Sequence, residues 1–368
     1  MAMRYLAGPQ QHASIATNQI MLQVVYACAP GVAIATWYFG FGILLNILLA
    51  SLFAVAFEAL ALHLRGLSPA PQLQDNSVLV TAVLFALTIP PGSPWWLVGS
   101  GIGFAVLIAK HAFGGLGQNP FNPAMCGYLV LLLAFPLDMT TWHVPNAQLL
   151  DGQSFTPFSW NGLRQSLLAS FPFLIGSEST LAPYIDGLAL ATPLIEFKMA
   201  GTSAIFTALD TNAAVLGRAA GTGWELMNIG YLMGGLYLLY RRIISWHIPV
   251  SIIVTVSAIS ALLYAPHSFA IYGTPYLHLL GSATMLGAFF IATDPVSAAT
   301  TTRGKLVYGL LIGCSIYSIR VWGSYLDSVA IAVLFGNFCA PLLDHLCRPR
   351  IYGHRKSRRL SAMQEQDR

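Results

Sequence analysis

Long apolar stretches, separated by short polar segments, follow one another along most of this 368-residue chain. Charged residues make up only 9% of it, whereas soluble domains carry about a quarter. A helical span needs about 20 apolar residues to cross a bilayer. We therefore expect an all-α polytopic membrane protein with about ten transmembrane helices. The predicted spans are 20–38, 41–64, 78–89, 95–109, 124–137, 224–240, 248–264, 276–292, 306–318 and 326–345.

Basic residues are distributed unevenly between the two ends of these spans. With both termini in the cytoplasm, 14 of the 18 Lys and Arg residues lie inside, seven of them in the tail between Arg348 and Arg368. Such an excess is typical of cytoplasmic loops. Arg164, Lys198, Arg218 and Arg320 are then outside. The net charge of +4 reflects this topology and a tail at anionic lipid, so no nucleic-acid partner is expected.

A weak internal repeat divides the apolar part of the chain into two halves. A shift of 205 residues places 85–90 (FALTIP) over 290–295 (FIATDP) and Pro136 over Pro341. Five spans per half is an odd number, so the second half is expected to be inverted. We predict two inverted five-helix repeats with spans interrupted by Pro and Gly, 1–137 and 223–346, an outer-face loop at 138–222 and a basic cytoplasmic tail at 347–368. Broken spans in matching positions of inverted halves indicate a site near the bilayer midplane.

Few ionisable residues fall within the predicted spans, and such residues are functional candidates by default. Glu58 is the clearest case, and Asp294 is the second candidate for an ion pathway. For Glu58 a purely structural carboxyl bound by a neighbouring helix is equally compatible with the sequence. Lys110 and His111 are near the predicted cytoplasmic face, where we expect their polar ends to reach out to the interface.

Two further segments carry local signals. Residues 114–123 (GGLGQNPFNP) form a broken element before the fifth span, where a helix beginning near Pro123 would offer free amide groups; tight glycine packing is the alternative. Residues 186–194 (DGLALATPL) hold Thr192 beside small residues before a proline. That setting suits either a helix cap or an accessible hydroxyl that accepts a covalent modification.

Four ordered motifs give the chain a family resemblance. They are 114–124 (GGLGQNPFNPA), 186–194 (DGLALATPL), 240–249 (YRRIISWHIP) and 292–297 (ATDPVS). With them the chain resembles the RnfD/RsxD family, whose members are the D subunits of Rnf-type ion-translocating oxidoreductase, or electron transport, complexes. It is more distantly similar to the B subunit of the sodium-translocating NADH:quinone reductase.

The resemblance implies FMN bound covalently through its phosphate to a threonine, attached by a flavin transferase outside the cytoplasmic membrane. In the family pattern an aspartate stands six residues before that threonine and an alanine directly before it. Asp186, Ala191 and Thr192 match, whereas Ala189 replaces a hydroxyl residue and Leu190 a small one. Thr192 is therefore the expected FMN phosphoryl threonine.

A second, non-covalent flavin such as riboflavin is also implied, toward the inner side. Thr293 and Asp294 are the candidates that could line its site. No metal is expected, because the five cysteines lack the spacing of a metal site.

The implied function is that of a membrane subunit that carries an electron-relaying flavin in a translocase coupling electron transfer to ion translocation. The implied partners are the A, B, C, E and G subunits of the complex, the flavin transferase and membrane lipid. The implied location is the bacterial inner membrane, with the flavin loop in the periplasm. The alternative is a stand-alone channel or secondary transporter, because urea and ammonium channels share the five-plus-five inverted architecture.

Overall fold

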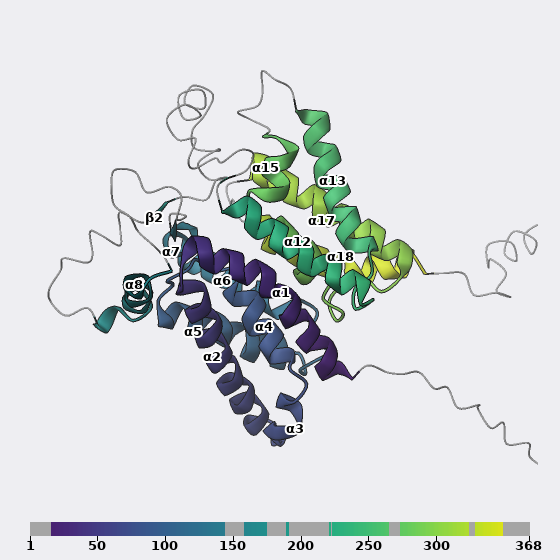
Figure 1. Ribbon diagram of the computed structural model, residues 1–368. Helices are drawn as coiled ribbons and strands as arrows, with labels where there is room; N and C mark the ends of the chain where they lie inside the picture. The colour runs from purple at the N-terminus through teal and green to yellow at the C-terminus, as the bar shows by residue number, and fades with distance from the viewer. Residues whose placement is uncertain are drawn as a thin grey trace, which may run out of the picture.

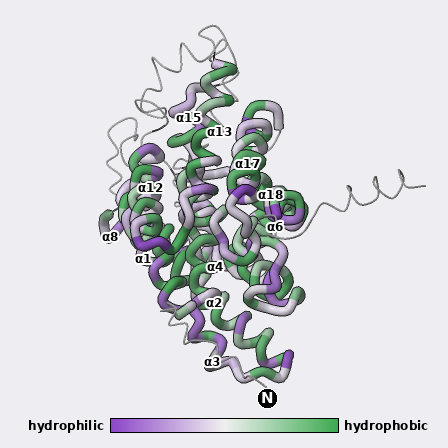
Figure 2. The backbone as a smooth tube through the Cα atoms, turned by 90° about the vertical axis from the view of Figure 1, so that its right-hand side faces the viewer, coloured by the Kyte–Doolittle hydropathy of each residue, from purple (hydrophilic) through white to green (hydrophobic). Residues whose placement is uncertain are grey.

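The computed structural model describes residues 16–143, 158–174, 189–190, 221, 223–264, 273–323 and 328–348. These residues form an all-α bundle, which confirms the predicted polytopic membrane fold (Figure 1). Apolar residues dominate along its helices (Figure 2). In the described part, four helices are long and apolar enough to cross a membrane: α1 (Thr17–Phe39), α2 (Gly42–Leu64), α17 (Thr302–Trp322) and α18 (Ser328–Leu346).

The remaining elements complete two sets of helices. After α2 the first half continues with α3 (Pro69–Leu73), α4 (Ser77–Ala86), α5 (Trp95–Gly103), the π-helix η1 (Phe104–His111), α6 (Pro123–Ala134) and α7 (Pro136–Thr140). The second half has α12 (Trp224–Tyr240), α13 (His247–Leu263), α15 (Pro275–Leu280), α16 (Thr284–Leu286) and the π-helix η4 (Gly287–Ile291) before α17 and α18. Between the halves are β1 (Trp142–His143), α8 (Trp160–Ser170), the 3₁₀ turn η2 (Pro172–Leu174) and β2 (Ala189–Leu190).

The 205-residue shift superposes these elements one by one. It carries α1 onto α12, α2 onto α13, α4 onto α16 and η4, α5 with η1 onto α17, and α6 onto α18. The equivalent helices α1 and α12 lie side by side and run antiparallel, because Gln23 contacts Tyr237 whereas Tyr38 lies beside Gly223. This geometry agrees with an inverted second half. The domain boundaries themselves stay a prediction.

Glycines let α1 and α12 approach closely. A Cβ atom at Gly234 would lie 1.9 Å from the carbonyl oxygen of Ala27, and one at Gly230 would lie 2.9 Å from the Cα of Gly31. Small residues at such contacts are the usual means of packing helices within a membrane. The contact between the two halves therefore depends on the absence of side chains at these positions.

The third and eighth spans are half-helices. Helix α4 has 10 residues, which is about 15 Å of helix and about half the hydrocarbon thickness. It ends before the Pro90–Pro91 pair, and Asn46 Nδ2 of α2 donates a hydrogen bond of 2.8 Å to the carbonyl oxygen of Pro90. Its counterpart, α16 with η4, ends before Pro295, and Asn122 Nδ2 donates to the carbonyl oxygen of Ile291 at 3.2 Å. Buried amides thus satisfy the carbonyls where both helices break.

Several predicted spans differ from the helices. The span predicted at 78–89 ends at Ala86, and the span predicted at 276–292 is divided among α15, α16 and η4. The span predicted at 306–318 extends over Thr302–Trp322, and the one at 124–137 breaks at Phe135. Proline and glycine cause the breaks, which a count of apolar residues does not register.

Candidate functional site

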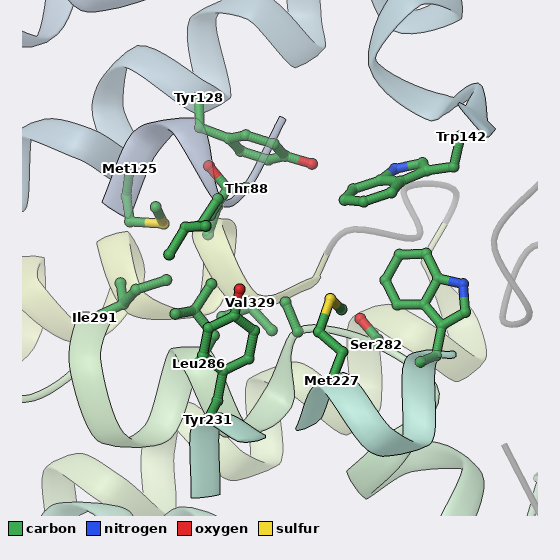
Figure 3. A pocket seen from close by; sticks show the side chains of 14 residues that line it. Thr88, Met125, Tyr128, Trp142, Met227, Tyr231, Ser282, Leu286, Ile291 and Val329 are labelled. Carbon is green, nitrogen blue, oxygen red and sulfur yellow. The ribbon is translucent and has the colours of Figure 1, made fainter. Parts of the chain in front are cut away.

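One cavity, the tryptophan cavity, lies where the two halves meet near β1. Its volume is about 40 Å³. It is lined by Leu87, Thr88, Met125, Tyr128, Trp142, Trp224, Met227, Tyr231, Ser282, Ala283, Leu286, Ile291, Val329 and Ala330 (Figure 3). The Trp142 and Trp224 ring centroids are 4.7 Å apart, and the ring of Phe39 lies against both. Aromatic and apolar walls with a few hydroxyl groups are typical of sites for organic cofactors.

A short strand pair brings Ala189 and Leu190, two residues of the predicted modification segment, to this cavity. β1 pairs antiparallel with β2, with Trp142 opposite Leu190 and His143 opposite Ala189. Trp142 is a lining residue of the tryptophan cavity. Along the chain, Leu190 precedes Thr192 by two residues. Asp186, Ala191 and Thr192 themselves lie outside the described residues.

A second and larger cavity, the lysine cavity, has a volume of about 330 Å³. Its polar walls include Ser77, Lys110, Asn119, Thr293 and Asp294, and Thr17 at the start of α1 also lines it. The structure thus places both Thr293 and Asp294 at one cavity. Asp294 Oδ2 accepts hydrogen bonds from Ser297 Oγ at 2.6 Å and from the Ser297 amide at 3.2 Å.

The two cavities occupy related positions in the repeat. Ser77 and Thr293 line the lysine cavity, and Ser282 and Thr88, their equivalents at the 205-residue shift, line the tryptophan cavity. Each cavity therefore has the start of one half-helix and the end of the other in its wall. The shared hydroxyl positions make the cavities pseudosymmetric, at opposite ends of α1.

A buried charge cluster adjoins the lysine cavity. Lys110 Nζ lies 2.8 Å from Glu58 Oε1 and donates to Ser77 Oγ at 3.0 Å. His111 Nε2 lies 2.9 Å from Glu58 Oε2, and Arg65 Nη1 lies 3.2 Å from His111 Nδ1. Glu58, Lys110 and His111 are 3%, 2% and 8% exposed. The expectation that Lys110 and His111 reach the interface is wrong, because Glu58 binds both inside the bundle.

A second buried cation occurs near the other cavity. Arg320, in the last turn of α17, is 2% exposed. It donates to Thr284 Oγ1 and Ser328 Oγ at 2.9 Å each, and to the carbonyl oxygen of His278. Arg320 is thus a core residue, although the charge pattern predicts an outer segment for it. In each half, a cation from the end of the fourth span binds a hydroxyl at the start of a half-helix.

The glycine-rich segment at 114–123 ends in a capped helix. Asn122 Oδ1 accepts hydrogen bonds from the amides of Ala124 at 3.0 Å and Met125 at 3.4 Å. The expected free amide donors at this helix start are therefore satisfied by Asn122. Asn119 and Asn122 instead contribute to the wall of the lysine cavity.

Sequence reasoning points to Glu58, Thr293 and Asp294, which line or adjoin the lysine cavity, but it does not point to several other residues around the two cavities. Trp142 and Trp224 stand next to apolar segments, where a tryptophan does not by itself indicate a site. Arg320 was used only to assign the orientation of the spans. The repeat is the signal that could have found more of them, since Ser77 and Thr88 match Ser282 and Thr293 at the 205-residue shift.

Comparison with known proteins places these features in a family. The family described as NQR2, RnfD, RnfE matches residues 5–353. The chain is 46% identical over 359 residues to the D subunit of the ion-translocating oxidoreductase complex of Yersinia enterocolitica, covering 96% of this chain and 99% of the relative. It is 46% identical over 361 residues to the protein of the same name from Salmonella newport, covering 97% and 100%.

Proposed function

The chain belongs to the NQR2, RnfD, RnfE family, and we propose on that premise that it carries FMN covalently bound to Thr192. Its similarity over nearly the full length of the named relatives makes it a membrane subunit of an oxidoreductase complex that couples electron transfer to ion translocation. Within that function, the flavin on Thr192 relays electrons and the protein supplies position and exclusion of water.

The observation that carries the proposal is the pairing of Leu190 with Trp142. Two residues of chain reach at most about 7 Å. A flavin attached at Thr192 would therefore start close to the mouth of the tryptophan cavity. The rings of Trp142, Trp224 and Tyr128 fit an isoalloxazine chemically, because aromatic rings stack favourably at offset or tilted geometry. At about 40 Å³ the cavity would have to widen to admit the ring fully.

We propose that the tryptophan cavity faces the periplasm across the bacterial inner membrane. The start of α1 and the end of α18 lie at one side of the bundle, and β2, α7 and α8 lie at the other (Figure 1). The basic tail after Leu346 then belongs in the cytoplasm, in keeping with the charge bias. Aromatic side chains exposed near the β2 side, including Trp37, Trp95 and Trp160, suit the membrane interface.

A second, non-covalent flavin such as riboflavin is proposed for the lysine cavity. Its volume of about 330 Å³ is in the range of small-molecule sites. Its pseudosymmetric relation to the tryptophan cavity supports the same class of ligand at both ends. Thr293 and Asp294 would then contact the ligand through their hydroxyl and carboxylate groups.

Glu58 and Asp294 remain our candidates for the ion pathway, because carboxylates within a membrane are costly. The proposed partners are the A, B, C, E and G subunits, the flavin transferase and lipid.

A stand-alone channel or transporter has no use for a flavin. The names of the relatives favour membership of a redox complex instead.

In-gel fluorescence after co-expression with the flavin transferase tests the covalent site. The denatured wild-type band should fluoresce under ultraviolet light, and Thr192→Ala should abolish the signal. Thr207→Ala, in the same predicted loop, is the matched control and should stay fluorescent. A dark wild-type band would leave the channel or transporter as the better account, and a fluorescent Thr192→Ala band would place the flavin elsewhere.

A further inference from the structure

The buried cluster forms a continuous polar chain between the protein surface and the lysine cavity. Arg65 is exposed at the end of α2, and its guanidinium contacts His111 Nδ1 at 3.2 Å. His111 Nε2 reaches Glu58 Oε2 at 2.9 Å, and Glu58 Oε1 reaches Lys110 Nζ at 2.8 Å. Lys110 is itself in the cavity wall. The His111–Glu58 and Glu58–Lys110 distances are within the range of proton-transfer contacts, and a small rotation of the His111 ring would align its Nε2–H with Glu58 Oε2.

The contacts fix which atoms carry protons. Arg65 can only donate, so His111 Nδ1 accepts and the hydrogen of the neutral ring is on Nε2, the atom 2.9 Å from Glu58 Oε2. Lys110 can only donate, toward Glu58 and toward Ser77 Oγ. Ser77 Oγ in turn donates to Asp75 Oδ1 at 2.7 Å. The branch through Ser77 and Asp75 therefore points away from Lys110, and only Glu58 is placed to return a proton to it.

These contacts disfavour a metal cation at Glu58. Hard cations bind several oxygen ligands. Both carboxylate oxygens of Glu58 instead face nitrogen groups, and one of these is a lysine ammonium. A sodium ion at this position would meet the positive charge of Lys110 at contact distance. The cluster is suited to moving protons.

We propose that His111, Glu58 and Lys110 form a proton relay that delivers protons from the surface at Arg65 to a ligand reduced in the lysine cavity. The inference rests on the proposed redox ligand of that cavity and on the complex's own electron transfer as the source of electrons. It assigns Glu58 to proton movement within the broader ion pathway.

Each cycle of the relay moves one proton from surface water to the ligand. The Lys110 Nζ–H bond breaks as the proton passes to a basic nitrogen of the reduced ligand. Nζ regains a proton from the Glu58 carboxyl, which receives it from His111 Nε2. His111 takes up its new proton at Nδ1 from surface water when the Arg65 guanidinium moves off that atom. Rotation of the imidazole ring then brings the protonated nitrogen back toward Glu58, and Arg65 contacts the bare nitrogen again. One proton leaves water and one reaches the ligand, and this rotation returns the three side chains to their starting states.

The test measures the rate of proton uptake by the complete purified complex. A light pulse with a soluble photosensitiser and sacrificial donor would supply electrons, and a pH-indicator dye would follow proton uptake. Wild type should show a rapid uptake phase. His111→Ala should slow this phase about a hundredfold, the usual scale for loss of one general acid–base group, and added imidazole should restore it. His63→Ala is the control, because His63 is an exposed histidine in the last turn of α2, the helix that also holds Glu58.

If His111→Ala fails to assemble, His111→Gln and Glu58→Gln replace it. Both retain hydrogen-bonding groups but cannot relay protons, so both should slow the rapid phase of proton uptake. Uptake at the wild-type rate in the two Gln variants would overturn the relay. So would an absence of uptake in wild type, or a slow His111→Ala phase that imidazole does not change. Flavin is counted in the same samples. Absence of flavin at Thr192 together with His111-dependent uptake would overturn the covalent site and leave the relay standing.

Discussion

Lys110 Nζ lies 2.8 Å from Glu58 Oε1, and both side chains are buried between α2 and η1. A buried pair of this kind is costly to break, because removal of Lys110 leaves the Glu58 carboxylate in a water-poor environment with only His111 beside it. The pair therefore has a structural consequence that is separable from any role in transport.

Removing only the cation should strongly destabilise the protein. Lys110→Met is expected to cost about 3–5 kcal/mol and to lower the Tm of the purified complex, measured by differential scanning fluorimetry. The double variant Lys110→Met/Glu58→Gln should recover most of that loss, because no buried charge remains. A single variant as stable as wild type, or a double variant no better than the single one, would show that the charges do not stabilise each other.

The α1–α12 contact should not tolerate a methyl group at Gly234. Its Cβ would lie 1.9 Å from the Ala27 carbonyl oxygen, so Gly234→Ala must move the backbone. We expect a loss of about 1–3 kcal/mol, seen as a lower Tm and a lower yield of folded protein. Met233→Ala, at a neighbouring residue that is 58% exposed, is the control and should change the Tm little. Equal behaviour of the two variants would contradict the close approach.

Aromatic contact in the tryptophan cavity should quench the fluorescence of the flavin that we propose on Thr192 in the native protein. Trp142→Leu is expected to raise native flavin fluorescence and to leave the fluorescence of the denatured band unchanged, because attachment at Thr192 does not require the ring contact. Trp160→Leu, at a tryptophan that is 80% exposed, should alter neither signal. Unchanged native fluorescence in Trp142→Leu would place the ring away from this cavity.

Filling the lysine cavity should expel the non-covalent flavin that we propose for it. Val296 lines this cavity, so Val296→Trp is expected to remove most of the flavin released by acid while leaving the covalent flavin in place. Chromatography of the acid extract measures the first, and in-gel fluorescence measures the second. Val250→Trp, at a position that is 40% exposed, controls for the added bulk. An undiminished extract from Val296→Trp would argue against this cavity as the second site.

The helical architecture was predictable because the bilayer imposes a length on apolar stretches. Most spans were found within a few residues, and the antiparallel contact of α1 with α12 agrees with the expected inversion. The breaks within α15, α16 and η4 were not predictable in detail, since they depend on which carbonyls Asn122 and Asn228 can satisfy. Asn228 Nδ2, for example, donates to the carbonyl oxygen of Leu280 at 2.9 Å.

The candidate sites were predictable only in part. Glu58 stood out as an acid among apolar residues, yet its partners Lys110 and His111 lie more than 50 positions away in the sequence. The sequence led us to expect Lys110 at the membrane interface. A lysine side chain at this position is long enough to reach either water or a buried carboxylate, and hydropathy does not distinguish the two. The wall of the tryptophan cavity depends on the pairing of Trp142 with Leu190. Strands of only two residues leave no recognisable pattern in the sequence, so this pairing could not be predicted.

Mass spectrometry of the proteolytic peptide that contains Thr192, prepared from the complex in its native host, determines whether this threonine carries the flavin. We predict a peptide heavier by FMN less one water, with fragmentation locating the addition on the Thr192 hydroxyl. An unmodified Thr192 peptide, or flavin found on another residue, would contradict this prediction.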